Sequence, residues 1–441
     1  MKRACADQIL GFLSFSNPCD PSAFKKFSIR EWNKALEWLD DSSLAFYFRR
    51  KLGETNATDA IPAWVLDRLE RSLSANQERI ADMSRRFDFL NRKFSHAGVR
   101  FLVVKGFSLV PEFCSDSALR HQSDLDYLLD EQSLPEARRI LVEAGYVEKQ
   151  TSSSQESIFL MHCGKAAVRG AEQYSAQAPH AVELHLDVWD SEVHRLPLMP
   201  RLFSVDRGAT HHWNGLTFPV LKDDDAFLLQ VLHACHHIFT YWIRASCFWE
   251  IGFFLNRRAS DVVLWNQVDL RIGDNRMLRE FVVIITELSA RLFKSPIPPL
   301  VRHWGRSLIP ATRVWIEHYG RDSVFSKLPS HEFTLFPKSK LILLLHQEYE
   351  DACGELRAAQ SRLTKFARVS HMKSSLREQP SLIVNLAWWR EHRVIQRSLF
   401  HLLAGLRYFC EIPRWKWRNR ARGSSHATWS VVERASRPRA S

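Results

Sequence analysis

The sequence predicts an α+β protein in which a small mixed β-sheet lies between a helical N-terminal region and a helical C-terminal region. In residues 1–97, apolar side chains recur three and four positions apart, as they do on the buried face of a helix. Residues 98–220 instead contain short β-branched and apolar runs bounded by glycine and polar segments, which is typical of strands. Helical periodicity returns over residues 221–412.

The clearest helix of the N-terminal region ends just before the first expected strand. Pro62 suits a first helical turn, and apolar residues then recur at helical spacing from Leu66 to Phe94. Gly98 follows as a helix stop, because glycine readily takes the left-handed conformation that closes many helices.

The central region predicts four strands and one helix. The helix is "LPEARRILVEAGY", with Gly145 at its C-terminal end. The expected strands are "VRFLVVKG", residues 124–129, "SIFLMH" and "AVELHLDVW".

Long amphipathic segments predict helices after residue 221. They are "DDAFLLQVLHACHHIFTYWIRASCFWEIGFFLNRR", "NRMLREFVVIITELSARLF", "SKLILLLHQEYEDACGELRAAQSRL" and "RSLFHLLAGLRYF". Residues 413–441 are polar and arginine-rich, so we expect a basic, disordered tail.

Composition narrows the class of protein. The 441 residues are 45% hydrophobic and carry a formal net charge of +12, which favours anionic partners such as nucleotides, nucleic acid or an anionic membrane surface. The eight cysteines are scattered without a CxxC pair, and the N-terminus lacks a convincing secretion signal. We therefore expect a cytoplasmic protein. No apolar run reaches the roughly 18 residues that span a bilayer.

Two aspartates interrupt the apolar strand at residues 124–129. Asp124 and Asp126 are two positions apart and so share one face of the strand. Like charges this close favour a cation between them, and a hard divalent ion such as Mg²⁺ or Mn²⁺ prefers oxygen ligands. On a later strand, Glu183, His185 and Asp187 also share one face. The alternative is that the aspartates line a solvated edge strand.

The segment upstream of the aspartates favours a phosphate ligand. Lys105 and Gly106 end a strand, where a lysine supplies positive charge and a glycine lets the backbone approach phosphates closely. Arg120 precedes the aspartates in the order Arg120-x-x-Ser123-Asp124-x-Asp126, and its guanidinium suits a bidentate phosphate contact.

These motifs, "FLVVKG", "LRHQSDLD", "EAGY" and "VELH", resemble the nucleotidyltransferase fold of the DNA polymerase beta superfamily. They are most similar to a poorly characterised bacterial group of nucleotidyltransferase family proteins. The resemblance covers roughly residues 60–290 and extends to a histidine-bearing helix followed by an arginine and an acidic residue, here His233, Arg244 and Glu250. The wider superfamily has Gly-Ser after its first strand, where this chain has Lys105-Gly106.

The resemblance implies metal-dependent transfer of a nucleoside monophosphate from an NTP, with ATP the expected donor, to an acceptor that the sequence does not identify. It implies that Asp124, Asp126 and Glu183 are catalytic residues that bind Mg²⁺ or Mn²⁺. The residues it implies for substrate binding are Lys105, Gly106, Arg120, Ser123 and His185. His185 alternatively supports the carboxylates.

Two other functions stay open. One is a toxin-type nucleotidyltransferase that modifies tRNA, which the basic charge favours. The other is a catalytically silent relative that binds a nucleotide or a partner. The intact carboxylates argue against this second alternative.

Two further groups of residues allow several interpretations. His233, His236 and His237, with Cys235 between them, could bind zinc, although helix packing is the commoner role of such residues. The arginines and tryptophans of residues 414–422 could contact single-stranded nucleic acid or an anionic membrane, or form a solvated tail. The oligomeric state is not predicted.

Overall fold

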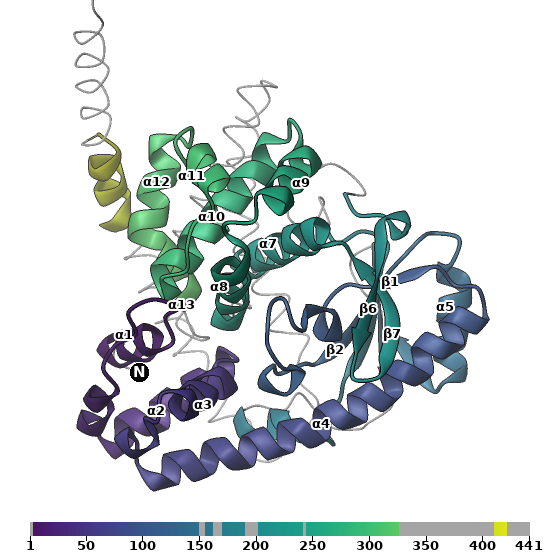
Figure 1. Cartoon of the computed structure of the whole chain (residues 1–441), viewed down its shortest axis with the longest axis horizontal. Helices are drawn as coiled ribbons and strands as arrows, with labels where there is room; N and C mark the ends of the chain where they lie inside the picture. The colour runs from purple at the N-terminus through teal and green to yellow at the C-terminus, as the bar shows by residue number, and fades with distance from the viewer. Residues whose placement is uncertain are drawn as a thin grey trace, which may run out of the picture. The chain divides into compact units, whose positions relative to one another are not determined.

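A computed structural model describes residues 3–149, 155–161, 170–189, 202–240, 244–325 and 410–420. Contacts divide the chain into two compact units, residues 1–306 and 307–441. The first unit confirms the predicted α+β class, because it combines a seven-stranded mixed sheet with helices before and after it in the chain (Figure 1). In the described part of the chain, every helix is too short or too polar to cross a bilayer.

The part of the chain before the sheet is helical. Ser28 caps α2 with its hydroxyl, and Glu31 reaches back to the Ser28 amide, which completes a capping box. The long helix α4 begins directly after Pro62 and is followed by Gly98 at φ 70°, as the sequence predicted. The helices are α1 (Arg3–Phe12), α2 (Ile29–Asp41), α3 (Ala45–Glu54) and α4 (Ala63–His96), with short 3₁₀ turns at Pro21–Lys26 and Thr58–Ala60.

The sheet has the strand order β3-β4-β5-β2-β1-β7-β6. The pairs β2–β5 and β1–β7 are parallel, and the other neighbours are antiparallel. One helix, α5 (Leu134–Glu143), follows β2. The strands are β1 (Phe101–Val103), β2 (Asp124–Leu129), β3 (Tyr146–Lys149), β4 (Glu156–Met161), β5 (Ala181–His185), β6 (Gly208–Trp213) and β7 (Leu216–Leu221).

Three of these strands were not among the predicted elements. The hairpin of β6 and β7 turns at Asn214 and Gly215, both with positive φ, which is the turn that an Asn-Gly pair favours. That pair was an available signal in the sequence. β3 is mostly exposed and lacks the alternation that marks a half-buried strand. β5 is shorter than the predicted nine-residue strand, so Asp187 lies beyond its end.

Alternation along the central strands separates a core face from a polar face. Leu125, Tyr127 and Leu129 of β2 join Val182 and Leu184 of β5 in one hydrophobic cluster. This cluster includes side chains of α4 and α5, and Figure 1 shows α4 running along the sheet. The residues between them, Asp124 and Asp126 on β2 and Glu183 and His185 on β5, therefore face the opposite side.

Helices follow the sheet in the first unit. Three aspartates occupy the first turn of α7, where they complement the positive end of the helix dipole. Asp261 and Asn275 cap α9 and α10. The helices are α7 (Asp223–Thr240), α8 (Ala245–Arg258), α9 (Val262–Ile272), α10 (Arg276–Phe293) and α11 (Pro299–Gly305).

The second unit contains α12 (Pro310–Trp315), a π-helical turn (Ile316–Gly320) and α13 (Arg321–Phe325). Residues 410–420 form a helix as well, so the start of the segment expected to be a disordered tail is helical. Glu411 accepts a hydrogen bond from the Tyr319 hydroxyl, and the Arg418 guanidinium lies over the Tyr319 ring, which anchors this helix. The helices predicted at residues 339–363 and 397–409 lie outside the described residues.

Candidate functional site

The register of two parallel strands brings the predicted carboxylates together. β5 pairs directly with β2, so Asp126 lies opposite Glu183, and Leu128 lies opposite His185. The sequence had left this neighbourhood conditional on the pairing of these strands. Asp187, the other carboxylate considered on the same segment, lies beyond β5 and accepts a hydrogen bond from the Trp189 amide at 3.3 Å.

Lys105 lies among these carboxylates. The Val104 amide donates to the Asp126 carbonyl at 3.2 Å, which holds the end of β1 beside β2. The Lys105 Nζ is 2.5 Å from Asp126 Oδ1 and 4.0 Å from Glu183 Oε2. Burial lowers the pKa of Lys105, but the neighbouring carboxylates outweigh burial and raise it above its usual value. Lys105 is therefore a fixed cation in this site.

His185 contacts the same two carboxylates. Its Nε2 lies 3.0 Å from Asp126 Oδ1 and 3.7 Å from Glu183 Oε2, and its Nδ1 lies 3.5 Å from Glu156 Oε1. Burial alone would raise the pKa of Asp126, but Lys105 and the hydrogen bond to His185 hold it below its usual range. Asp126 is thus ionised, and His185 supports it.

The pKa values of Asp124 and Glu183 shift in the opposite direction from that of Asp126. Burial, followed by the charge of Asp126, raises the pKa of Asp124 and raises that of Glu183 far above its usual range. Asp124 also accepts a hydrogen bond from the Ser123 hydroxyl at 3.2 Å. One lysine is thus not enough to balance three neighbouring carboxylates.

The geometry fits a divalent cation. Asp126, Glu183 and His185 each offer a ligand atom within 4.8 Å of the others. Asp126 Oδ2 is buried, and it has no hydrogen-bond partner among the described residues. A buried carboxylate oxygen without a partner is costly, and a metal ion would satisfy it while offsetting the repulsion among the carboxylates.

Gly106 is required by both its backbone and its surroundings. Its φ is 61°, and a Cβ placed there would lie 2.2 Å from Gln122 Nε2. Gln122 is buried, and it donates a hydrogen bond to the Asp124 carbonyl at 2.8 Å. The glycine therefore lets the turn after β1 approach the segment that leads into the aspartates.

We expect Gly106→Ala to destabilise the fold more than Gly98→Ala does. Gly98 also has a positive φ but has nothing within 4 Å of its Cβ position, so alanine there costs about 1–2 kcal/mol of backbone strain. At Gly106 the contact with Gln122 adds about 1–3 kcal/mol. Urea unfolding would measure both losses. Gly106→Ala/Gln122→Ala should recover the difference, and equal losses in the two single variants would contradict this account.

Arg120 forms a buried ion pair with Glu250 of α8. Its Nε is 3.2 Å from Glu250 Oε1 on α8, and the Tyr47 hydroxyl donates to the same oxygen at 2.9 Å. Burial opposes the charge of Arg120, but Glu250 raises its pKa above the usual value. The sequence had matched Glu250 to a family position but had not paired it with Arg120, and it had not singled out Tyr47.

Arg79 is a second residue that the sequence reasoning missed. It projects from α4, is buried, and donates to the carbonyls of Gln122, Ser175, Ala178 and Pro179. These carbonyls belong to the segments that lead into β2 and β5. Arg79 therefore fixes the entry of both strands that carry the carboxylates. The only sequence signal was an arginine on the apolar stripe of α4.

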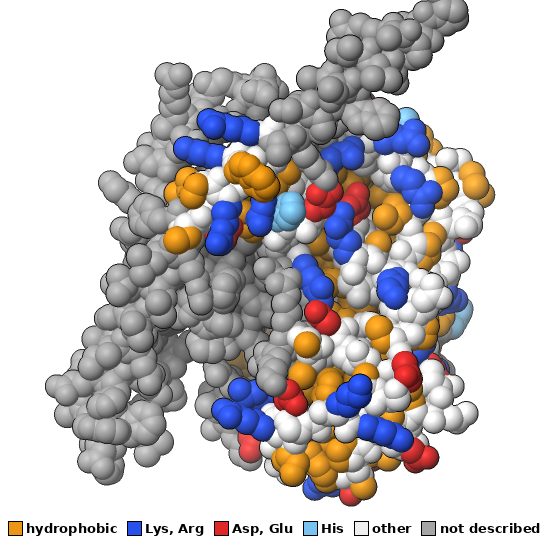
Figure 2. Space-filling model, turned by 90° about the vertical axis from the view of Figure 1, so that its left-hand side faces the viewer, with side chains coloured by type: hydrophobic (Ala, Val, Ile, Leu, Met, Phe, Trp, Pro, Cys, Tyr) orange, Lys and Arg blue, Asp and Glu red, His pale blue; other side chains and the backbone are white. Residues whose placement is uncertain are grey.

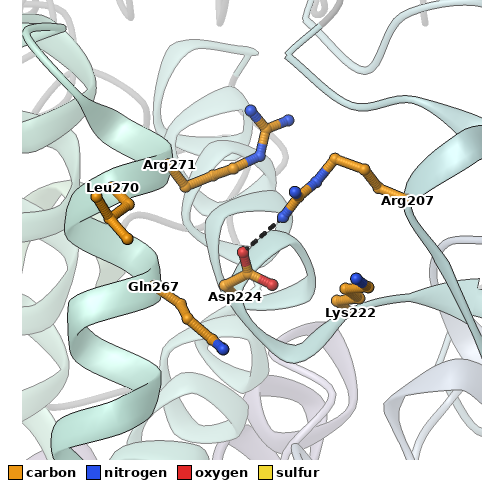
Figure 3. A pocket seen from close by; sticks show the side chains of 6 residues that line it. All are labelled: Arg207, Lys222, Asp224, Gln267, Leu270 and Arg271. Atoms are coloured by element: carbon orange, nitrogen blue, oxygen red, sulfur yellow. Dashed lines mark hydrogen bonds and ion pairs between the residues drawn. The ribbon is translucent and has the colours of Figure 1, made fainter.

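A hollow separate from the carboxylate site lies elsewhere in the described residues. It encloses about 350 Å³ and is lined by Arg207, Lys222, Asp224, Gln267, Leu270 and Arg271 (Figure 3). Its arginines are already paired, because Arg207 contacts Asp224 and Asp225 at 2.8 Å and Arg271 contacts Asp225 at 2.6 Å. None of its lining residues belongs to the carboxylate site, and we assign it no ligand.

The carboxylates, Lys105 and His185 lie together at the centre of a mixed sheet, and carboxylate oxygens are donors that divalent cations such as Mg²⁺ prefer. In agreement, residues 28–294 match the family model described as an uncharacterised nucleotidyltransferase, and the chain belongs to this family. No curated protein and no solved structure matches the chain.

Proposed function

We propose that this protein is a metal-dependent nucleotidyltransferase that moves a nucleoside monophosphate from an NTP, with ATP the expected donor, to an acceptor still to be identified. The observation that carries the proposal is the cluster of Asp126, Glu183 and His185, with Asp124 and Lys105 beside it. A bound Mg²⁺ or Mn²⁺ would neutralise charge that develops on the transferring phosphoryl group.

The carboxylates and His185 have different roles in this proposal. Asp124, Asp126 and Glu183 would hold the cation, and His185 keeps Asp126 ionised and oriented through its hydrogen bond at 3.0 Å. Alternatively, Glu183 would not bind the cation and would act as a base toward an acceptor hydroxyl.

Lys105 and Gly106 would bind the donor phosphates. In the structure, Lys105 neutralises Asp126, and a cation bound by the carboxylates would free its ammonium group to contact phosphate. Arg120 and Ser123 would complete the substrate site, although Arg120 is held by Glu250. The turn at Gly106 lets backbone amides approach the phosphates.

The test of the function is a transfer assay. Purified protein is incubated with NTPs labelled at the α-phosphate, Mg²⁺ or Mn²⁺, and a lysate as the source of acceptor. Metal-dependent appearance of label in a protein, RNA or small-molecule fraction supports the proposal and identifies the acceptor class. Metal-dependent NTP binding without labelling of any fraction would indicate a silent relative instead.

We expect Lys105→Ala to weaken NTP binding by about 10- to 100-fold and to leave binding of the bare nucleoside nearly unchanged, because Lys105 would contact only the phosphates. Isothermal titration calorimetry in saturating Mg²⁺ would measure both affinities. Lys149→Ala, at an exposed lysine that ends β3, is the control for lost charge. Equal losses for the two ligands would show that Lys105 acts on the fold.

A nucleic-acid acceptor receives no particular support from the visible surface. Figure 2 shows one face, on which the coloured Lys and Arg side chains lie scattered among acidic, polar and hydrophobic ones rather than in one continuous patch. The assay therefore includes RNA as one acceptor class among several.

A further inference from the structure

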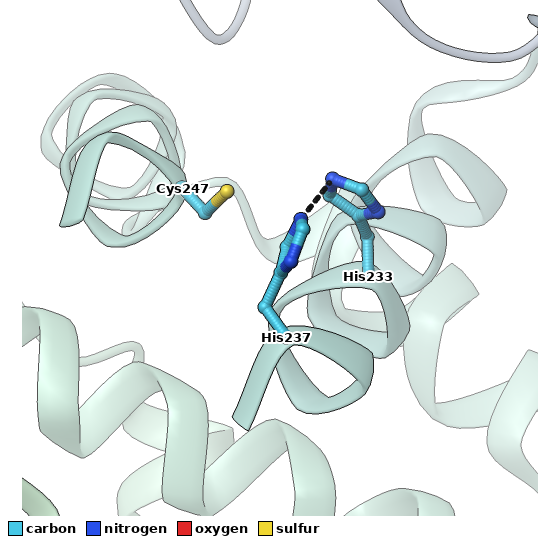
Figure 4. Close-up of side chains that lie close together, drawn as sticks. All are labelled: His233, His237 and Cys247. Carbon is cyan, nitrogen blue, oxygen red and sulfur yellow. Dashed lines mark hydrogen bonds between the residues drawn. The ribbon is translucent and has the colours of Figure 1, made fainter. Parts of the chain in front are cut away.

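A second group of metal-ligating side chains lies where α7 meets α8. His233 and His237 are four residues apart on α7, so their rings project from the same side of that helix. Cys247 comes from the first turn of α8. Each residue offers a ligand atom within 4.8 Å of the other two, and Figure 4 shows both rings and the sulfur on neighbouring helices.

The spacing of the donor atoms is close to that of a tetrahedral zinc site. Zinc ligands at the usual bond lengths are separated by about 3.3–3.7 Å. The Nε2 atoms of His233 and His237 are 3.0 Å apart. A small movement of either ring would place both nitrogens on one ion.

The ring nitrogens of these histidines are not fully satisfied by each other. Two neutral imidazoles can share only one proton in the contact between their Nε2 atoms. His237 Nδ1 is buried, and the described residues offer it no hydrogen-bond partner. This atom lies on the other side of the ring from Nε2, so a metal bound at Nε2 would not satisfy it, and the observation that supports the site is the approach of the two Nε2 atoms.

Burial keeps the two histidines neutral, which is the form that binds a metal, and it keeps Cys247 as a thiol that a bound metal can deprotonate. Burial lowers the pKa of both histidines well below the usual value, so their nitrogen lone pairs are free at neutral pH. Burial, and then Glu250, raises the pKa of Cys247 to about 12, so the thiol is protonated without a metal. Zinc binding would displace that proton to solvent.

We propose that His233, His237 and Cys247 form a zinc site that joins α7 to α8, with a fourth position open to water or another ligand. Imidazole and thiolate select zinc over magnesium, so this site is chemically distinct from the carboxylate cluster. It differs from the ligand set that the sequence suggested, because Cys247 replaces His236 and Cys235.

The site has a consequence for Arg120, which the proposed function places in the substrate site. α8 also carries Glu250, which holds Arg120 through a buried ion pair. An ion shared by α7 and α8 would fix the first turn of α8, one turn before Glu250. In this proposal the zinc therefore holds the first turn of α8 and helps to keep Arg120 in place.

The experiment is a Co²⁺ titration of the reduced, metal-free full chain. We expect one equivalent of Co²⁺ to give the visible bands of tetrahedral cobalt and a sulfur-to-cobalt charge-transfer band in the near ultraviolet. Zn²⁺ should abolish both. Cys247→Ser should lose the charge-transfer band, and His237→Gln should weaken binding by at least about 10-fold.

Two controls make this test specific. Cys235→Ser removes a different buried thiol, which lies on α7, and should keep the full cobalt spectrum. Asp126→Asn, at the carboxylate cluster, should keep it as well. Absence of the charge-transfer band in the folded wild-type protein, or its retention in Cys247→Ser, would overturn the proposal.

Thermal unfolding gives an independent readout. Zn²⁺ should raise the melting temperature of the metal-free wild-type protein by about 5 °C or more beyond the rise in Cys247→Ser, in which only the carboxylate cluster can bind the ion. An equal rise in both proteins would overturn the assignment. If Cys247→Ser does not fold, His237→Gln takes its place in this comparison.

Discussion

The Asp124→Asn/Asp126→Asn variant is expected to lose Mg²⁺-dependent nucleotide binding and to transfer nucleotide about 1,000-fold more slowly or worse, while keeping its fold. Both side chains lie on the polar face of β2, and Asp126 is fully buried beside Lys105 and His185. Asparagine preserves their size but removes the charge that a divalent cation requires. Glu183 would remain to pair with Lys105 in the variant.

The measurement does not depend on the unknown acceptor. Titration with Mn²⁺, followed by the paramagnetic resonance signal of the free ion, counts the bound metal in the wild type and the variant. Calorimetry with a non-hydrolysable NTP, with and without Mg²⁺, then tests the nucleotide. Asp187→Asn is the matched control, because Asp187 follows β5 and takes no part in the cluster. Unchanged Mn²⁺ affinity in the double variant would refute the site.

Local patterns were sufficient to predict the elements that carry this site. The proline before α4, the glycine after it, the apolar run of β2 and the alternation in β5 are each a signal that is read within a few residues. Alternation alone placed Asp124 with Asp126 and Glu183 with His185. The pairing of β5 beside β2 had to come from the structure, because nearly sixty residues separate the two segments.

The contacts that hold the site could not be predicted in the same way. The Tyr47 hydroxyl and Glu250 are 203 residues apart in the chain, and Arg79 reaches carbonyls nearly one hundred residues away. Such contacts depend on how helices pack, and a single sequence carries no periodic signal for that packing. The β6–β7 hairpin is a different case, because its Asn-Gly turn was visible in the sequence.

The second large effect is expected at the buried ion pair between Glu250 of α8 and Arg120, which precedes β2. Glu250→Ala should lower the free energy of unfolding by about 3–5 kcal/mol, because it leaves the Arg120 guanidinium buried without its partner. Arg120 and Glu250 have side-chain exposures of only 12% and 2%, so water cannot readily replace the lost contact. The Tyr47 hydroxyl loses its acceptor in the same variant.

Urea unfolding of matched variants separates charge from packing. Glu54→Ala, which removes the exposed partner of Arg50 on α3, should change the free energy of unfolding by about 0.5 kcal/mol or less. Arg120→Met/Glu250→Leu should recover most of the loss in Glu250→Ala, because a well-packed apolar pair leaves no buried charge behind. A double variant as unstable as Glu250→Ala would mean that the lost volume, and not the stranded arginine, causes the destabilisation.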